Sequence, residues 1–248
     1  MANLNGKVAL VTGGSRGIGA ETARQLAAKG ATVAISYKSS KDQAQQVVDS
    51  ITQNGGSAQA YQANAQDTSA VQQLVKDVVS DHGGLDILVN NAGVFTPGEI
   101  AGGEVDVYSQ NFDINVRGVY ATTAVAAQHL NDNGRIINIG SFLGTKALPG
   151  LSAYNGTKAA IAAFSRTWAK ELAAKGITVN TVSPGSIDTE MNPADAEKNP
   201  GADFQRTLNA FGRYGKPEEI AAAVVFLASP EASFITGAEL AVDGGASA

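Results

Sequence analysis

The segment VALVTGGSRGIG, residues 8–19, decides the fold of this chain. Its first part, Val8–Thr12, is apolar and β-branched like a buried strand, and a glycine-rich turn separates it from a helical stretch with Thr22 and Leu26. Such a turn lets the backbone approach a pyrophosphate, which then lies at the helix N-terminus, where amide groups and the helix dipole favour negative charge. Three glycines alone also suit a turn without a ligand, but their place after the first strand favours a dinucleotide.

The same alternation of short β-branched runs and longer amphipathic stretches continues along the whole chain. Seven strands are expected, at Val8–Thr12, Thr32–Tyr37, Ala58–Gln62, Ile87–Asn90, Arg135–Ile139, Thr178–Val182 and Glu239–Val242. This order predicts an α/β protein with a doubly wound, seven-stranded parallel sheet, because crossover helices join parallel strands. No repeat or linker interrupts the alternation, so a single domain is expected over residues 1–248.

Local signals mark several helix ends. Apolar residues recur at helical spacing between the third and fourth strands, after Asp67 or Thr68 as the cap and before Gly83. Lys29-Gly30 and Lys175-Gly176 are typical of a C-terminus, where a glycine adopts positive φ. Pro217, followed by two glutamates, is typical of a helix start. The stretch 184–215 is the only long irregular one in the sequence.

Composition excludes several classes of function. Eighteen Lys and Arg against 23 Asp and Glu give a net charge of −5, which does not favour nucleic acid or a membrane surface as a partner. The chain has no cysteine, which excludes disulfides and thiolate metal sites. Met1–Lys7 lacks a signal-peptide core, and the longest apolar run, Ile220–Ala228, is too short to span a membrane. The expected location is the cytoplasm.

The end of the second predicted strand indicates which dinucleotide fits. The common dinucleotide fold has an acidic residue there that binds the ribose hydroxyls, but this chain has Tyr37, Lys38 and Ser39. Without a carboxylate to repel it, a ribose 2′-phosphate would find Lys38, serine hydroxyls and Arg16 of the glycine turn. Lys38 alone is typical of a solvated loop lysine. The missing acid together with two cations predicts NADP(H) as the cofactor.

Tyr154 and Lys158 lie four residues apart in a predicted helix, so they project from the same face. The pKa of a free phenol is about 10. It must fall by about 3 units, which corresponds to roughly 4 kcal/mol, before the phenol can exchange protons near neutral pH. An ammonium group about 4 Å away stabilises the phenolate by roughly this free energy at an effective dielectric constant of about 20. The pair is therefore sufficient as an acid/base device, although a packed tyrosine beside an extended lysine has the same spacing.

Taken in order, these motifs resemble the short-chain dehydrogenase/reductase family. The resemblance rests on Thr12–Gly19, Asn90–Gly93, Asn115, Ser141, Tyr154 with Lys158, Pro184-Gly185, Thr236-Gly237 and Asp243–Gly245. It spans nearly the whole chain. It implies a Rossmann-type fold and hydride transfer between C4 of a nicotinamide and a carbonyl or alcohol carbon, with no metal.

The resemblance also implies a role for each residue. Tyr154 would protonate the carbonyl oxygen, or accept the proton in reverse, and Ser141 would hydrogen-bond that oxygen. Lys158 would lower the pKa of Tyr154 and bind the nicotinamide ribose, and Asn115 would hold a water on the proton relay. The expected cofactor contacts are Gly13, Ser15, Arg16, Gly17, Ile18, Gly19, Tyr37, Lys38, Ser39, Asn64, Ala65, Asn91, Ala92, Gly93, Tyr154, Lys158, Pro184, Gly185, Ile187 and Thr189. Asn64-Ala65 stands where many relatives have an aspartate on the adenine amino group, which puts the adenine contact in question.

Several hypotheses remain open. A small ketone or secondary alcohol is the favoured substrate, because Gln128–Asn133, where a carrier protein is usually met, has no Lys or Arg. The alternatives are a 3-oxoacyl-acyl-carrier-protein reductase and a nucleotide-binding regulator on the same fold. A hydrolase is disfavoured, because Ile139 stands where a nucleophile elbow needs glycine. The resemblance implies a homotetramer, and residues 186–213 are expected to form a substrate lid.

Overall fold

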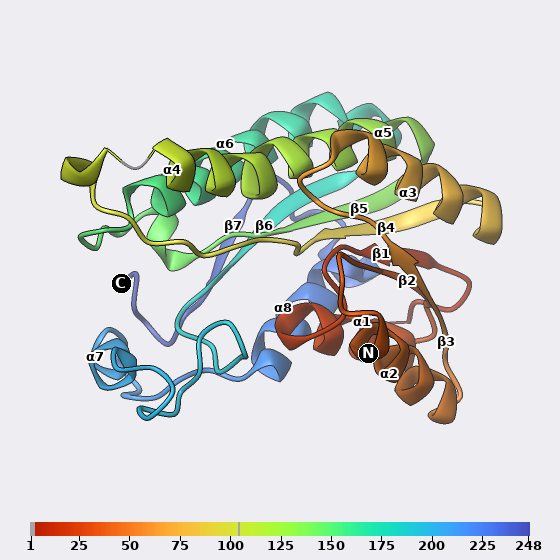
Figure 1. Ribbon diagram of the computed structural model, residues 1–248. Helices are drawn as coiled ribbons and strands as arrows, with labels where there is room; N and C mark the ends of the chain where they lie inside the picture. The colour runs from red at the N-terminus through yellow and green to blue at the C-terminus, as the bar shows by residue number, and fades with distance from the viewer. Residues whose placement is uncertain (1–2, 104) are drawn as a thin grey trace.

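The computed structural model describes residues 3–103 and 105–248. Its centre is a seven-stranded sheet in the order β3-β2-β1-β4-β5-β6-β7, parallel throughout, which confirms the predicted doubly wound α/β fold (Figure 1). The strands are β1 (Val8–Val11), β2 (Thr32–Tyr37), β3 (Ser57–Gln62), β4 (Leu85–Asn90), β5 (Leu130–Ile139), β6 (Thr178–Pro184) and β7 (Glu239–Val242). Along the chain, β2 and β3 extend the sheet from β1 to one edge. β4 then pairs with the other side of β1, and β5 to β7 extend the sheet to the opposite edge.

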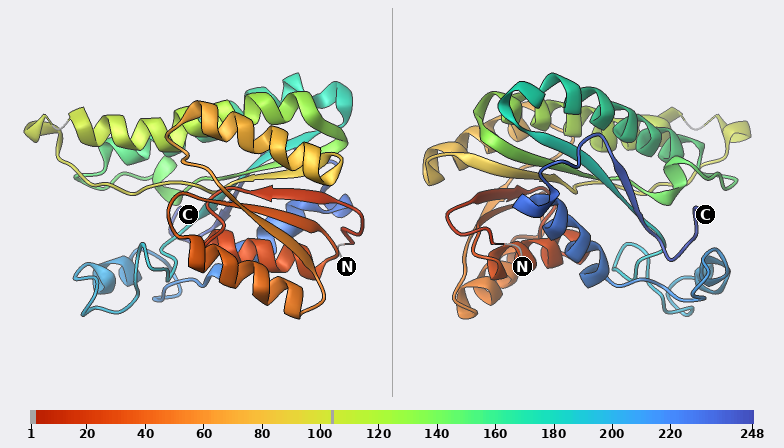
Figure 2. Two further views of the ribbon diagram at one scale, coloured as in Figure 1. Left: turned by 45° about the vertical axis from the view of Figure 1, so that its right-hand side comes forward. Right: turned by 180° about the vertical axis from the view of Figure 1, so that it is seen from behind.

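Helices cover both faces of the sheet. One face carries α1 (Gly17–Ala28), α2 (Lys41–Gln53) and α8 (Pro217–Ala228). The opposite face carries α3 (Thr68–His82), α4 (Val105–Phe112), α5 (Val119–His129) and α6 (Ser152–Glu171). Figure 2 shows the two layers from the side and from behind, with the short helix α7 (Ala202–Thr207) below the sheet in a separate lobe.

The core follows from the alternation of side chains along each strand. In β1, Ala9 and Val11 belong to the apolar cluster with residues of α1 and α8, whereas Leu10 between them belongs to the cluster with residues of α3 and α5. Successive side chains of a strand face opposite sides of the sheet, and a sheet covered on both sides buries both sets. β4 and β6 are accordingly buried along their whole length.

The predicted helix ends are confirmed. The Asp67 side chain caps α3 by accepting hydrogen bonds from the amides of Ser69 and Ala70, at 2.9 and 3.1 Å. Gly83, which ends α3, has a φ of 77°, and Gly30 and Gly176 are also left-handed, at 98° and 67°. Pro217 is the first residue of α8. Helix ends can be predicted here because capping by a side chain or by a glycine depends only on a few neighbouring residues.

Two expectations about the elements need correction. β5 begins at Leu130, five positions before the expected Arg135, because Leu130 pairs with Leu85 across an irregularity in the β4–β5 ladder. The segment 186–213 is not wholly irregular, since it contains α7 and a network of side-chain hydrogen bonds. No helix among the described residues is both long and apolar enough to cross a membrane.

Candidate active site

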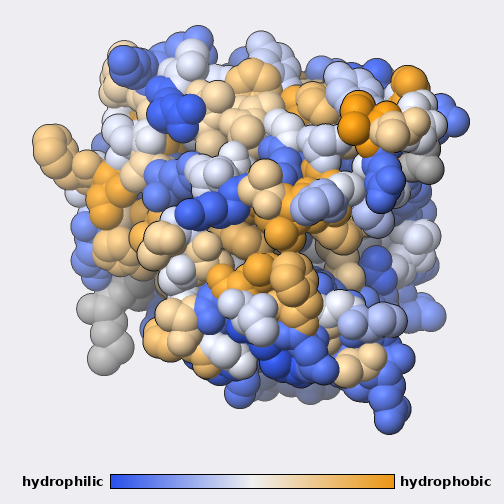
Figure 3. Space-filling view, turned by 90° about the vertical axis from the view of Figure 1, so that its left-hand side faces the viewer, coloured by the Kyte–Doolittle hydropathy of each residue, from blue (hydrophilic) through white to orange (hydrophobic). Residues whose placement is uncertain are grey.

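The predicted site residues gather where the strands end. Residues after β1, β2, β3, β4, β5 and β6 all come to the carboxyl edge of the sheet, because the strands are parallel. The chain reverses direction across the sheet between β1 and β4, and ligands of open α/β sheets bind at this kind of switch point. Figure 3 views this side of the molecule, where apolar residues gather about its hollowed middle.

The glycine turn after β1 is shaped for close backbone approach. Gly13 has a φ of 64°, and a Cβ atom there would lie 2.9 Å from the Cα of Ala92. A Cβ atom at Gly19 would lie 2.4 Å from the Asn91 side-chain nitrogen. Both positions therefore exclude any larger residue, which is how the turn and the loop after β4 come into direct contact.

Asn91 and Thr12 hold this contact together. The Asn91 Nδ2 donates to the carbonyls of Thr12 and Gly13 at 2.9 and 3.0 Å. The Thr12 hydroxyl accepts from the backbone amides of Asn91 and Ala92, each at 3.0 Å. The side chain of Asn91 therefore shapes the glycine turn, and its expected contact with the cofactor stays a prediction.

The start of α1 fits a dinucleotide pyrophosphate. Arg16 is the residue before the helix, and its side chain makes no capping hydrogen bond. The first-turn amides of α1, at Gly17, Ile18 and Gly19, thus remain without a side-chain cap at the positive end of the helix dipole. Gly13, Gly17 and Gly19 have no side chains to cover these amides, and Ser15 lies in the same turn. These residues would hold the phosphates of the cofactor.

At the adenosine end of the predicted site, some of the expected residues are exposed and others are buried. Lys38 and Ser39 are exposed at the end of β2, as a 2′-phosphate site requires, whereas Tyr37 is 9% exposed and belongs to the apolar core. Its ring is therefore a core side chain, and the expected contact of Tyr37 with the cofactor stays a prediction. Asn64 Oδ1 accepts a hydrogen bond from the Gln66 amide at 3.2 Å, and Ala65 packs against Gly118.

The proposed catalytic side chains converge at the end of β5. Ser141 follows β5 through Gly140, where a Cβ atom would lie 2.6 Å from the Ser183 hydroxyl, so only glycine fits between β5 and β6. Tyr154 and Lys158 come from the first turns of α6. The Lys158 Nζ lies 5.6 Å from the centre of the Tyr154 ring and donates to the Ile139 carbonyl at 2.9 Å. Ser141 hydrogen-bonds with the Tyr154 phenol.

Burial dominates the acid–base properties of this pair. It raises the pKa of Tyr154 to about 12, opposed by the hydrogen bond with Ser141, and it lowers the pKa of Lys158 to about 8. The expected lowering of the Tyr154 pKa by Lys158 stays a prediction, and in the protein burial raises that pKa. The physical reason is desolvation, which disfavours the charged form of both groups.

Asn115 lies in a π-helical turn, Asp113–Gly118, between α4 and α5. Its side chain pairs with the backbone of Val94, accepting from the amide at 2.8 Å and donating to the carbonyl at 2.9 Å. It also contacts the Thr157 hydroxyl of α6 at 3.3 Å. The side-chain amide is thus occupied with the loop after β4, and the water-holding role stays a prediction. π-Turns of this kind are frequent at functional sites.

Apolar side chains surround Tyr154. The Phe95 ring meets the Tyr154 ring edge-on, with centroids 4.9 Å apart. Phe142, Leu143 and Leu151 form a buried cluster against which Tyr154 and Leu208 pack. Leu208 lies just after α7, so one residue of the predicted lid does reach the site, whereas Met191, Phe204 and Phe211 are exposed.

The predicted nicotinamide contacts lie at the root of the segment 186–213. Pro184 ends β6, and Gly185 lies so close to Asp243 that a Cβ atom would approach its Cα to 2.8 Å. Ile187 is buried and pairs with Gly215. Thr189 packs on the glycine turn, because a Cβ atom at Gly17 would lie 3.3 Å from its methyl carbon. The predicted nicotinamide contacts therefore lie beside the predicted phosphate site.

Sequence reasoning missed residues that build the site without touching a reacting group. Ser36 accepts from the Gly13 amide at 3.2 Å, and Thr157 joins Asn115 to the Tyr154 carbonyl, donating to the latter at 2.7 Å. Glu190 pairs with Arg16 at 3.2 Å. The signal for Ser36 was a polar residue within an otherwise apolar strand. The sequence had no such signal for Glu190, because its partner Arg16 is 174 positions away.

Comparison with known proteins agrees with this geometry. A family described as enoyl-(acyl carrier protein) reductase matches residues 13–247. A short-chain dehydrogenase from Burkholderia cenocepacia, solved in complex with NADP, is 47% identical, with 99% of this chain and 100% of that chain covered and a TM-score of 0.96. The chain belongs to the short-chain dehydrogenase/reductase family. As a short-chain dehydrogenase/reductase it is an oxidoreductase, and the resemblance stated from its motifs is confirmed.

Named relatives within the short-chain dehydrogenase/reductases differ in function. A 3-oxoacyl-[acyl-carrier-protein] reductase of Synechocystis is 41% identical, over 99% of this chain and 98% of its own length. A cyclic-di-GMP-binding biofilm dispersal mediator protein of Escherichia coli is 40% identical, over 98% of each. Similarity of this degree fixes the family and leaves the substrate to be argued from the site.

Proposed function

We propose that this protein transfers a hydride between NADP(H) and a small apolar ketone or secondary alcohol, with Tyr154 as the proton donor or acceptor. The proposal rests on the placement of Tyr154 beside Ser141 and Lys158, next to the apolar cluster of Phe142, Leu143 and Leu151. When bound, NADP(H) supplies or takes up the hydride at its nicotinamide. In reduction the Tyr154 phenol gives the carbonyl oxygen its proton while the Ser141 hydroxyl holds that oxygen.

The choice of NADP(H) is supported by the end of β2. Lys38 and Ser39 are exposed there, with no acidic side chain at position 37. Losing charge-assisted contacts to the 2′-phosphate costs about 1.5 to 3 kcal/mol, so kcat/KM for NADPH is expected to exceed that for NADH roughly tenfold to a hundredfold. Equal values for the two cofactors would contradict this. The test variant is Lys38→Asp, because Tyr37 lies in the core and an aspartate there would also disturb packing.

A free ketone is favoured over a carrier-bound acyl chain because residues 128–133 present no Lys or Arg. The Synechocystis relative makes the 3-oxoacyl substrate the second candidate. Purified protein should be assayed with NADPH on a panel of ketones and on a 3-oxoacyl carrier protein, with Tyr154→Phe as the control for protein-dependent reduction. Faster turnover of the carrier-bound substrate would reverse the order of the two candidates.

A regulatory role on the same fold is the third candidate, supported by the similarity to the biofilm dispersal mediator protein. The site of this chain argues for catalysis, because a binding protein has no need of Ser141, Tyr154 and Lys158 together. Tight binding of cyclic di-GMP by a protein that reduces no ketone would favour regulation. The proposed location is the cytoplasm, supported by the absence of cysteine.

A further inference from the structure

An ion pair joins the glycine turn to the root of the segment 186–213. The Arg16 Nη1 lies 3.2 Å from Glu190 Oε2, and Gln43 of α2 donates to the other carboxylate oxygen at 3.4 Å. Both oxygens of Glu190 are thus held at the edge of the cofactor site. Arg16 is one of the two cations expected to bind the 2′-phosphate, so its pairing with a carboxylate bears directly on cofactor choice.

Glu190 is placed by a tight turn. The Asn192 amide donates to the Thr189 carbonyl at 3.1 Å and contacts the Thr189 hydroxyl at 3.2 Å, which closes the turn around Glu190. Thr189 itself packs against Gly17. The carboxylate is therefore directed to the start of α1 by the backbone on both sides of it.

The two cations expected at the 2′-phosphate differ in their surroundings. Lys38 makes no ion pair with any residue in the described ranges, whereas Arg16 is partly neutralised by Glu190. The Arg16 and Glu190 side chains are 53% and 57% exposed. An exposed pair of this kind is weak, so a doubly charged phosphate can replace the carboxylate.

We propose that Glu190 competes with the ribose 2′-phosphate of NADP(H) for Arg16 and thereby limits how strongly the protein prefers NADP(H) over NAD(H). This inference rests on the proposed cofactor. A guanidinium has five N–H groups and can face two anions at once, but the two anions then repel each other. Whether the phosphate displaces Glu190 from Arg16 or shares Arg16 with it, the cost in binding free energy falls only on NADP(H). NAD(H) has a hydroxyl in place of the 2′-phosphate and does not compete for Arg16.

The test is direct binding of NADP⁺ and NAD⁺ to the purified full chain by titration calorimetry. Glu190→Gln keeps the shape of the side chain and removes its charge. We expect the Kd for NADP⁺ to fall about two- to tenfold, the size of a weak exposed ion pair plus the relieved repulsion, with the Kd for NAD⁺ unchanged. Glu197→Gln, in the same segment but hydrogen-bonded only through its backbone amide, is the matched control and should change neither Kd.

A double-mutant cycle separates competition from simple repulsion. In an Arg16→Met background, Glu190→Gln should no longer improve NADP⁺ binding. A gain that persists there would overturn competition for Arg16. Weaker NADP⁺ binding in Glu190→Gln alone would also overturn it, because Glu190 would then be holding Arg16 in place for the phosphate. If the unaltered protein binds neither dinucleotide, the proposed function fails with it; if it prefers NADP⁺ and Glu190→Gln changes nothing, only this inference fails.

Discussion

Among single residues, the site depends on Tyr154 and Lys158. Burial shifts the pKa of each toward its neutral form. Tyr154 is protonated at neutral pH because burial raises the pKa of its phenol to about 12, so it is ready to donate a proton to a ketone. The reverse reaction needs the phenolate. For the proposed reaction we therefore expect ketone reduction near neutral pH and faster alcohol oxidation as the pH rises.

Tyr154→Phe should remove most carbonyl reduction while leaving NADP⁺ binding nearly unchanged, because only the hydroxyl acts on the reacting oxygen. General acid catalysis contributes about 10² to 10⁴ in rate, so a loss in that range is expected. The measurement is single-turnover reduction of a ketone that the parent reduces, together with calorimetry of NADP⁺ binding. Turnover equal to the parent would show that Tyr154 is not the acid.

Lys158 should make stability depend on pH. Burial lowers its pKa to about 8 in the folded protein, against about 10.4 when unfolded. Between these values the unfolded chain binds more protons, so the free energy of unfolding rises with pH from about 8 to 10, by at most about 1.4 kcal/mol per pH unit. Below pH 8 the buried charge is a cost in the folded state that Lys158→Met removes.

The measurement is urea unfolding of the cofactor-free protein from pH 7 to pH 10. Lys158→Met should be the more stable protein at pH 7 and should lack this rise, while the exposed Lys198→Met should keep it. Equal pH dependence in the parent and in Lys158→Met would contradict the assignment. The raised pKa of Tyr154 enters only above about pH 10, where it lowers stability.

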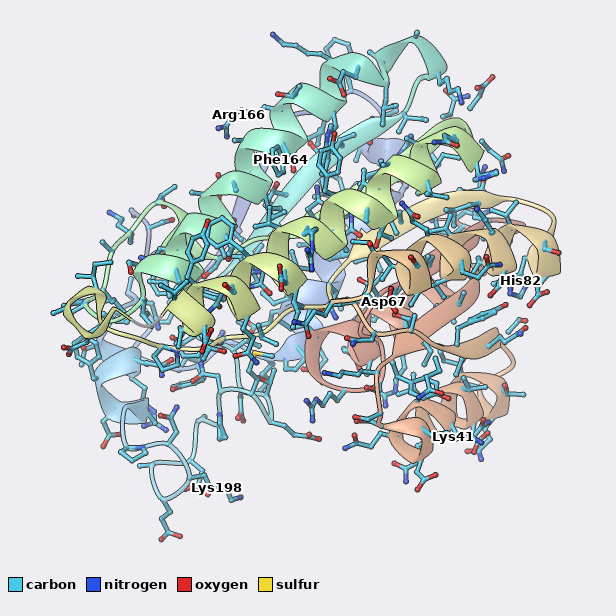
Figure 4. The ribbon with its side chains drawn as sticks, turned by 45° about the horizontal axis from the view of Figure 1, so that its top comes forward. Lys41, Asp67, His82, Phe164, Arg166 and Lys198 are labelled. Atoms are coloured by element: carbon cyan, nitrogen blue, oxygen red, sulfur yellow. The ribbon has the colours of Figure 1, made fainter. Side chains whose placement is uncertain are left out.

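At the level of elements, the segment 186–213 forms a lobe at the edge of the sheet (Figure 2). It is fastened at its ends, where the Gly215 amide donates to Ser186 and the Asp188 amide to Gly215, each at 2.9 Å. Between them amide side chains of the segment hydrogen-bond to one another, such as Asn192 with Gln205 at 2.8 Å. Figure 4 shows Lys198 at the outer end of this lobe, far from α6.

We predict that this segment orders over the bound substrate. Amide hydrogen exchange should show poor protection in the free protein and greater protection with NADP⁺ and a ketone analogue, since closing the site excludes water from the reacting groups. Leu208, which already packs on the cluster around Tyr154, should show the earliest gain. α8 is the internal reference and should not change. High protection in both states would instead indicate a fixed wall.

For the whole molecule, two groups of exposed apolar side chains outside the segment 186–213 bear on assembly. One comprises Tyr108 of α4 and Tyr120 of α5, 51% and 53% exposed, beside Ala159 and Ala163 on the outer side of α6. Tyr120 packs on Phe164, which Figure 4 labels on α6. The other comprises Phe234, fully exposed, with Phe226 of α8. A tetramer built of two kinds of dimer contact needs two such faces, each of which pairs with its own copy.

We therefore predict a homotetramer. Light scattering at micromolar protein should give four times the monomer mass, and Tyr120→Glu and Phe234→Glu should each reduce it to a dimer, because a charge on either face is then buried against its copy. Phe204→Glu on α7, which lies on neither face, is the control and should leave the tetramer intact. A monomer mass for the unaltered protein would refute the prediction.

Local chemistry controls the features that could be predicted correctly from the sequence. β-Branched runs gave the strands, the cap at Asp67 and the glycine at Gly83 gave the bounds of α3, and the order of motifs predicted the family. These hold because strand burial, helix capping and glycine turns depend on residues close together in the chain. The spacing of Tyr154 and Lys158 on one helix belongs to the same class.

The tertiary structure alone decided what depends on burial and on distant partners. It placed Tyr154 where desolvation at the end of β5 raises its pKa, and no spacing in the sequence reports desolvation. It placed Tyr37 in the core and gave the Asn91 side chain to Thr12 and Gly13. It also brought Glu190 to Arg16 across 174 positions, a contact that exists only because the parallel strands end at one edge of the sheet.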